Sequence, residues 1–183
     1  MKRYYNLKKF MNIKIRKASL ADADGIAETH ARSFKEGHRE FMPQVSLAMV
    51  NKDDDSIKRW KNRLIQTNSH TLIAEDKQKN IGLIYLMVDC KIDEKNLIAE
   101  IVYFYIDPDY WRQGIGTLLW KEAREYLLKQ NIFEVFCWVL KSNPKSRAFY
   151  ESLGAKSDGT EQTVEKLGTT TIQIKYNLLI EQN

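Results

Sequence analysis

The chain has 183 residues, of which 43% are hydrophobic and 29% charged, which is typical of one globular domain with a single core. Its net charge of +5 comes from scattered Lys and Arg residues, whereas nucleic-acid-binding proteins usually show a clustered basic face, so we expect an anionic small molecule and no nucleic acid as partner. No apolar stretch is long enough to span a membrane, so we predict no membrane partner. Cys90 and Cys137 show no spacing typical of a disulfide framework or a metal site, so we predict no metal site and a cytoplasmic location.

The N-terminus differs in character from the rest of the chain. The opening run MKRYYNLKKF is basic and aromatic without a hydrophobic period, so we predict an appendage over residues 1–11 and a single domain over residues 12–180. The alternating run NIKIRK then predicts a half-buried strand at 12–17.

Two helices are expected in the first third of the domain. Ser19 or Asp22 caps a helical pattern whose apolar residues continue to Phe34. Pro43 breaks the next segment, and three aspartates then supply negative charge at the start of a second helix at 56–66.

The remaining pattern alternates strands with helices. Strand patterns occur at residues 70–75, 81–90 and 97–106, and Pro108 ends the last because proline lacks the amide that a β-ladder needs. A helical pattern follows through about Gln130, and the apolar run FEVFCWVL predicts a central strand at 133–140. A short helix and strands near 155–161 and 169–178 complete an α/β (α+β) layer fold.

The stretch WRQGIGTLLW, residues 111–120, places two glycines just before a run of helix formers. A helix start leaves N–H groups without partners and favours negative charge, so bare backbone at Gly114 and Gly116 predicts an anion site. A Walker loop would need Lys and Ser or Thr after its last glycine, and a dinucleotide fingerprint would need a third glycine where Leu119 stands. A tight turn alone would explain one glycine but not two.

Residues 99–155 resemble the core of the GCN5-related N-acetyltransferases, the GNAT superfamily. Trp111-Arg-Gln-Gly-Ile-Gly is similar to the family signature Arg/Gln-x-x-Gly-x-Gly/Ala, with Trp111 in place of Arg or Gln and Arg112 as a candidate source of the missing charge. In that family this loop binds the pyrophosphate of acetyl-CoA with backbone amides. The resemblance implies acetyl-CoA as cofactor and a GNAT-type mixed sheet of about six to seven strands, splayed between the fourth and fifth and flanked by about four helices.

A second stretch, VLKSNPKSRAFYESLGA at 139–155, resembles the closing motif of the same family. Local rules explain part of it, because Asn143 suits an N-cap, Pro144 the first helical position and Gly154 the C-terminal stop. Two such motifs at this separation are more specific than either one alone.

The resemblance implies a catalytic site beside the glycine turn. Glu100, the one acidic residue of 97–106, is our candidate general base, with an idle hydrated glutamate and a water chain as alternatives. Tyr150 holds the position of the family's usual acid for the leaving thiolate. Asn143 is a candidate cofactor contact, although capping alone would justify it. The full set of expected cofactor contacts is Phe104, Tyr105, Ile106, Trp111, Arg112, Gln113, Gly114, Ile115, Gly116, Thr117, Asn143 and Ser146.

The functional hypothesis is an acetyl-CoA-dependent N-acetyltransferase that acetylates a primary amine by direct transfer in a ternary complex. A non-catalytic acyl-CoA-binding sensor is the alternative, and we expect a monomer or homodimer. The acceptor is a small-molecule or peptide amine that the sequence does not name. Candidate acceptor-side residues are His30, Phe34, His38, Phe41 and Trp60, although such aromatics are usually core, and Glu36, Glu40 and Asp53 to Asp55 as attractors of a cation.

Overall fold

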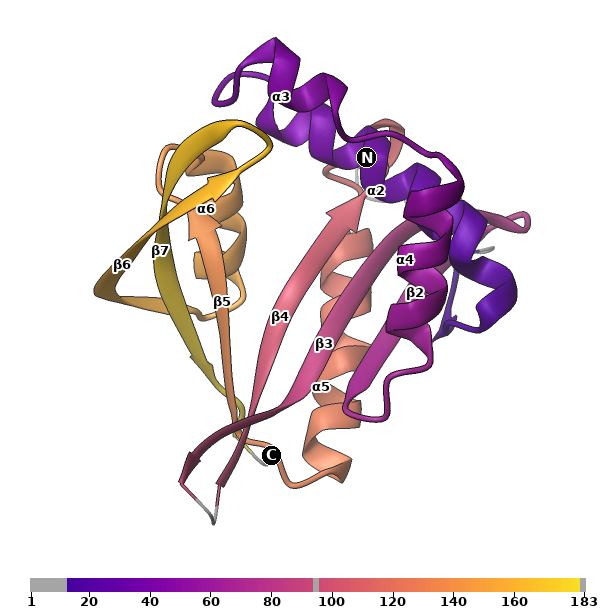
Figure 1. Ribbon diagram of the computed structural model, residues 1–183. Helices are drawn as coiled ribbons and strands as arrows, with labels where there is room; N and C mark the ends of the chain where they lie inside the picture. Colours follow the sequence, from indigo (N-terminus) through magenta and orange to yellow (C-terminus); the bar gives the residue numbers. More distant parts are fainter. Residues whose placement is uncertain (1–12, 94–95, 182–183) are drawn as a thin grey trace, which may run out of the picture.

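The computed structural model describes residues 13–93 and 96–181, so the predicted N-terminal appendage lies outside the described residues. The strands form one mixed seven-stranded sheet in the order β1-β2-β3-β4-β5-β7-β6, in which only β4 and β5 are parallel (Figure 1). Their bounds are β1 Ile13–Lys17, β2 Ser69–Asp76, β3 Lys79–Asp93, β4 Asn96–Ile106, β5 Glu134–Leu140, β6 Lys156–Lys166 and β7 Thr169–Leu179. The predicted mixed sheet is confirmed.

The helices of the described residues flank this sheet. They are α2 Ala23–His38, α3 Gln44–Ala48, α4 Asp54–Leu64, α5 Ile115–Lys129 and α6 Pro144–Ser152, with short 3-10 turns η2 Leu20–Asp22 and η3 Pro108–Tyr110. The sequence did not predict α3, which begins directly after Pro43 and is too short to show a helical period. Within the described ranges, no helix has the length and apolar character to cross a membrane.

The sheet separates two apolar cores. On one face, α5 packs on strand residues of a cluster that includes Ile84, Ala99, Ile101, Ile115 and Leu119. On the opposite face, α2 and α4 pack on the sheet through a second cluster that includes Ile26, Trp60, Leu83 and Tyr85. Because adjacent strand residues face opposite ways, β2, β3 and β4 contribute to both cores, and the apolar runs of β3 and β4 follow from this burial on both faces. The buried residues of β5, Val135, Cys137 and Val139, all belong to the first core.

Candidate active site

Strands β4 and β5 part halfway along β4. They pair at four positions only, from Ile98 opposite Glu134 to Ile101 opposite Cys137. Directly after Ile101, Val102 is an extra residue in the β3–β4 ladder, since Leu86 is opposite Ile101 and Tyr85 is opposite Tyr103. Such a bulge bends its strand and increases the local twist. The bulge therefore lies where β4 leaves β5, and the two arrows diverge beyond it (Figure 1).

The backbone groups of β4 beyond the bulge alternate between the two neighbouring strands. Asp107 N–H donates to Ile81 O at 2.8 Å, so the amide groups of Tyr105 also face β3, while those of Phe104 and Ile106 face the β5 side. The carbonyl of Ile106 already accepts from Ser33 Oγ at 2.9 Å and from Trp111 Nε1 at 2.7 Å. Phe104 and the Ile106 N–H thus remain as backbone partners for a ligand in the gap. Tyr105 does not, because its amide groups face β3.

The glycine turn leaves backbone exposed at the start of α5. Gly114 is the N-cap with φ +81°, and an added Cβ there would meet no atom within 4 Å. Among the residues that the structure describes, no side chain caps the first turn, which contains Ile115, Gly116 and Thr117. Arg112 also has a positive φ of 58°, so its backbone turns sharply beside Gly114. The side chains of Trp111 and Gln113 bond back to the carbonyls of Ile106 and Asp109, so they do not cap these amides.

Gly116 has a different structural reason. An added Cβ would lie 2.9 Å from Cζ of Phe149, on α6. The expectation that both glycines bare the backbone for an anion therefore needs correction. Gly114 allows the left-handed turn, whereas Gly116 lets α5 approach the Phe149 ring closely.

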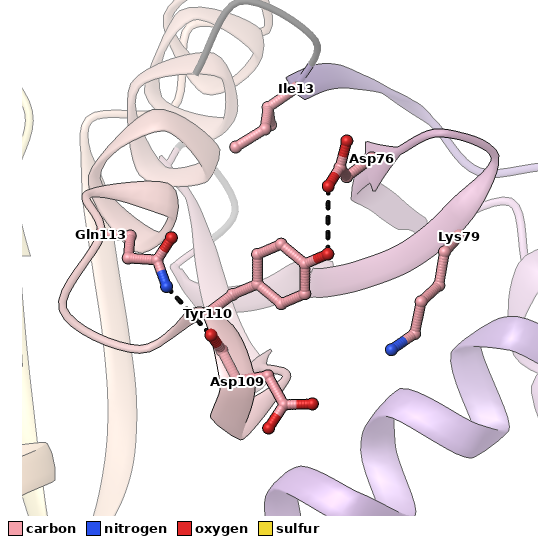
Figure 2. Close-up of a pocket in the computed structure, with 6 residues that line it drawn as sticks. All are labelled: Ile13, Asp76, Lys79, Asp109, Tyr110 and Gln113. Atoms are coloured by element: carbon pink, nitrogen blue, oxygen red, sulfur yellow. Dashed lines mark hydrogen bonds between the residues drawn. The ribbon is translucent and has the colours of Figure 1, made fainter. Parts of the chain in front are cut away.

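Ion pairs to a buried aspartate anchor the loop before the turn, a feature that the sequence analysis did not predict. Asp107 is 1% exposed and accepts from Arg32 Nη1 at 3.0 Å and Lys79 Nζ at 3.2 Å, while its second oxygen accepts from the Asp109 N–H. Figure 2 shows the adjoining cavity of about 270 Å³, where the Tyr110 hydroxyl donates to Asp76 at 3.0 Å. The side chains that line this cavity hold the loop in place, because their polar groups bond to other groups of the protein.

Tyr150 projects from α6 toward the point where the strands part. Its ring centroid lies 6.3 Å from that of Phe104, and its hydroxyl lies beside the thiol of Cys137, which belongs to the last β4–β5 pair. Burial, followed by the nearby Cys137 and Tyr105 groups, raises the pKa of Tyr150 well above its usual value. The hydroxyl therefore keeps its proton at neutral pH, at the point where the strands part.

Glu100 lies at the same level on the opposite face. Its neighbours Ala99 and Ile101 belong to the core under α5, so strand alternation directs Glu100 to the face covered by α2 and α4. The side chain is half-buried opposite Phe136, and burial raises the pKa of its carboxyl group. A carboxylate with a raised pKa suits a general base near neutrality.

Asn143 has a structural role. Its side chain is buried, its Oδ1 accepts from the Ser146 N–H at 3.0 Å, and its Nδ2 donates to Gly37 O at 3.1 Å. The first bond is the predicted N-cap of α6, and the second ties the end of α2 to the end of β5. Both ends of the amide are thus engaged within the protein, and this geometry favours a structural role over a cofactor contact.

Aromatic side chains gather beneath α2 on the face that carries Glu100. The ring of His30 lies 5.0 Å from Tyr105, 5.2 Å from Tyr103 and 5.7 Å from Trp60. Trp60 is 1% exposed, so it belongs to the core, as aromatic residues on an apolar face usually do. Of the acidic candidates, Asp53 is the N-cap of α4 and accepts from Ser56 N–H. Within the described residues, no group of three or more His, Cys, Asp or Glu side chains could hold a metal ion.

Comparison with known proteins gives the family. The sequence profile of the acetyltransferase (GNAT) family matches residues 31–155. The chain belongs to this family. A spermidine N(1)-acetyltransferase of Thermoplasma acidophilum is 27% identical to this GNAT protein over 163 residues, which cover 85% of this chain and 98% of that protein. The [ribosomal protein bS18]-alanine N-acetyltransferase of Escherichia coli K12 is 38% identical over 56 residues, 31% of this chain and 38% of that protein.

A solved structure extends the likeness to the fold. The crystal structure of PaiA N-acetyltransferase from T. acidophilum in complex with coenzyme A matches with a TM-score of 0.75 at 24% identity, covering 92% of this GNAT chain and 99% of that one. Acetyl-CoA is the cofactor of the family. The residues present fit it, because the turn at Gly114 offers uncapped amides for a diphosphate and β4 offers unpaired backbone groups to an extended arm.

Proposed function

We propose that this chain transfers an acetyl group from acetyl-CoA to a primary amine within a ternary complex. One observation carries the proposal: a candidate acid and a candidate base lie on opposite faces of the sheet where β4 and β5 part. Tyr150 reaches this point from the α6 side, and Glu100 lies on the side of α2 and α4. Two substrates entering from the two faces would meet between these groups.

The proton chemistry of the two side chains is complementary. Bound acetyl-CoA supplies an activated thioester, and the chain must provide a neutral amine and a proton for the departing sulfur. Deprotonating an alkyl ammonium of pKa near 10.4 costs about 4.6 kcal/mol at pH 7. Glu100 would accept this proton, directly or through water, and Tyr150 would donate one to the sulfur. The unpaired N–H of Phe104 is a candidate donor to the developing oxyanion.

Direct transfer is favoured over an acyl-enzyme route. The thiol of Cys137 is the nucleophilic side chain next to Tyr150, and burial, opposed in part by the Tyr150 hydroxyl, raises its pKa to about 12. A buried thiol of this kind stays protonated and is a poor nucleophile. Alignment of two bound reactants can lower the barrier by about 7–11 kcal/mol, more than one acid or base usually contributes.

The acceptor is proposed only as a primary amine, on a small molecule or a peptide. The named relatives act on two kinds of amine, spermidine and the alanine of a ribosomal protein. A cytoplasmic protein that is a monomer or a homodimer, without nucleic acid, completes the proposal.

The test is turnover by the purified full-length chain. Acetyl-CoA is mixed with a panel of amines, and release of free thiol is followed at varied concentrations of both substrates. We expect turnover with at least one amine and intersecting double-reciprocal plots, because both substrates must be bound together. Parallel plots would contradict direct transfer. Binding of CoA without turnover of any amine would favour the acyl-CoA sensor, and absence of CoA binding would reject both.

A further inference from the structure

The face that carries Glu100 has a charge pattern that selects among amines. This inference rests on the proposed function, because it takes this face as the acceptor side. His30 marks the region: its ring packs on Tyr103 and Tyr105, the β4 residues that follow the bulge at Val102. An amine that approaches the gap from the side of α2 would therefore pass close to His30.

The charges that act on His30 are positive. They come from Lys166 at the end of β6, whose turn into β7 reaches toward α2 (Figure 1), from Arg63 and Arg59 of α4, and from His38 further along α2. The Arg63 guanidinium lies 5.1 Å from the Trp60 ring and donates to the Tyr103 hydroxyl at 3.2 Å, which fixes it within the aromatic cluster. Burial first, and these charges second, lower the pKa of His30 to about 3, so its imidazole is neutral at physiological pH.

Nearby acidic side chains are already paired with cations. Glu36 pairs with Arg39, Glu40 with Lys145 at 2.8 Å, and Glu161 with Lys141 at 2.6 Å. Glu165 neighbours Lys166 on β6, and strand alternation directs it to the other face. Glu100 is thus the acidic side chain that β4 supplies to this face.

We propose that the acceptor side binds an amine without a second positive charge, of the class of α-amino groups next to a carbonyl, and excludes polyamines, with Lys166 and Arg63 setting this preference. The positive charges of Lys166 and of Arg63, which is held against the Tyr103 hydroxyl, disfavour a second ammonium group on this face. At pH 7 roughly one α-amino group in ten is neutral, against about one alkyl amine in 2,500. A site rich in positive charge and with one carboxylate suits the amine that loses its proton readily.

The experiment compares three acceptors at pH 7.5 in low salt: spermidine, alaninamide and an uncharged tetrapeptide amide that begins with Ala. We expect kcat/KM for the better α-amine to exceed that for spermidine at least tenfold. The smaller and larger α-amines distinguish a small-molecule from a peptide source of the same group. Lys166→Glu should lower the ratio of kcat/KM for the better α-amine to that for spermidine about tenfold, and Lys166→Gln should lower this ratio less. Added salt should lower the same ratio in the wild type.

Lys156→Glu is the matched control. Lys156 is exposed at the opposite end of the same strand, roughly 26 Å away, because the β7 partners of the two lysines are eight residues apart. This change alters the net charge equally, so it should leave the discrimination unchanged. Equal or better use of spermidine by the wild type, or the same response to Lys156→Glu and Lys166→Glu, would overturn the proposal.

A binding measurement decides the proposal if no acceptor is turned over. Spermidine is titrated by calorimetry into the wild-type chain and into Lys166→Glu, each saturated with CoA. We expect no binding to the wild type and measurable binding to Lys166→Glu. Spermidine binding to the wild type would overturn the proposal on charge selection, whereas failure of turnover alone would count against the proposed enzyme activity.

Discussion

The two faces of the gap between β4 and β5 are built from different chemistry. On the α5 and α6 side, the site consists mainly of main-chain groups: the turn at Gly114, the uncapped start of α5 and the unpaired edge of β4. On the α2 and α4 side, side chains determine the surface, with His30 and Arg63 held among aromatic rings. A site made of backbone groups can bind the same diphosphate whatever side chains those residues carry. A site made of side chains changes whenever one of its residues changes. The first face therefore indicates the cofactor, and under our proposal the second determines the acceptor.

The largest expected effect comes from closing the main-chain site. Gly114→Val places a β-branched residue at φ +81°, which costs about 1–2 kcal/mol and displaces the turn from the position that frees its amides. We expect CoA affinity, measured by calorimetry, to fall more than 100-fold.

Gly159→Val controls for the backbone strain itself. Gly159 has a φ of +84°, and its added Cβ would likewise meet no atom within 4 Å, but it lies in β6. This variant should lose similar stability and keep its CoA affinity. Equal loss of affinity in both variants would show that Gly114 has no special role in binding.

Tyr150→Phe tests the acid on the cofactor side. Removal of one general acid should lower kcat about 10²–10⁴-fold, while CoA affinity should change by less than about threefold because the main-chain site is intact. Tyr126→Phe is the comparison, since Tyr126 lies near the C-terminal end of α5, where its ring stacks on His70 with 3.5 Å between centroids. An unchanged kcat in Tyr150→Phe would remove the hydroxyl from the mechanism.

Glu100→Gln tests the base on the acceptor side and should have a smaller effect, about 100-fold in kcat, because water and the solvent can take the proton. Wild-type kcat/KM should rise with pH through the raised pKa of Glu100, and this limb should be lost in the variant. If the rise of kcat/KM with pH is the same in Glu100→Gln as in the wild type, the titrating group is not Glu100.

The same variant should gain stability at neutral pH. Burial raises the Glu100 pKa above its unfolded value, so ionisation increasingly opposes folding as the pH rises above the unfolded value, and the loss is complete once the pH exceeds the raised pKa. Melting temperatures should favour Glu100→Gln at pH 7 and converge below about pH 4, where both side chains are neutral. Lower activity with higher stability is the result that a merely structural glutamate would not give.

Gly116→Ala should have the smallest effect on the reaction. Its Cβ would press on Phe149, which we expect to cost about 1–3 kcal/mol and to lower the melting temperature by several degrees. CoA affinity should stay within about threefold of the wild type, unlike Gly114→Val. Recovery of the melting temperature on adding Phe149→Leu would locate the strain at that ring, and a large loss of affinity would contradict the separation of the two glycines.

Local rules made much of the fold and of the cofactor side predictable. Asn143 caps α6 because its short side chain bonds to the amide three residues later, and the sequence shows this pattern directly. Asp53 caps α4 by the same rule, although the sequence analysis took the aspartates there only as negative charge before a helix that begins at residue 56. The end of β4 before Pro108 and the turn at Gly114 are likewise visible in the sequence. These features depend on neighbours in the chain, so they are visible without coordinates.

Long-range contacts could not be predicted in this way. The reason for Gly116 is a ring on another helix, and Asn143 bonds to Gly37 on a helix from the first third of the chain. Asp107 is held by Arg32 and Lys79, which come from α2 and β3. Whether the backbone groups of Tyr105 face the gap or β3 depends on the strand register. A bulge shifts that register by one residue.

The brief pairing of β4 with β5 divides the sheet into two leaves, one of four strands and one of three. Four residue pairs join the two leaves along the backbone. The bond from Asn143 to Gly37 adds a link between α2 and the end of β5, where the strands have parted. An extended ligand arm that hydrogen-bonds to β4 would work as an eighth strand across this seam. Amide hydrogen exchange should therefore slow on CoA addition mainly at the facing edges of the two leaves, far more than in β1 or β2.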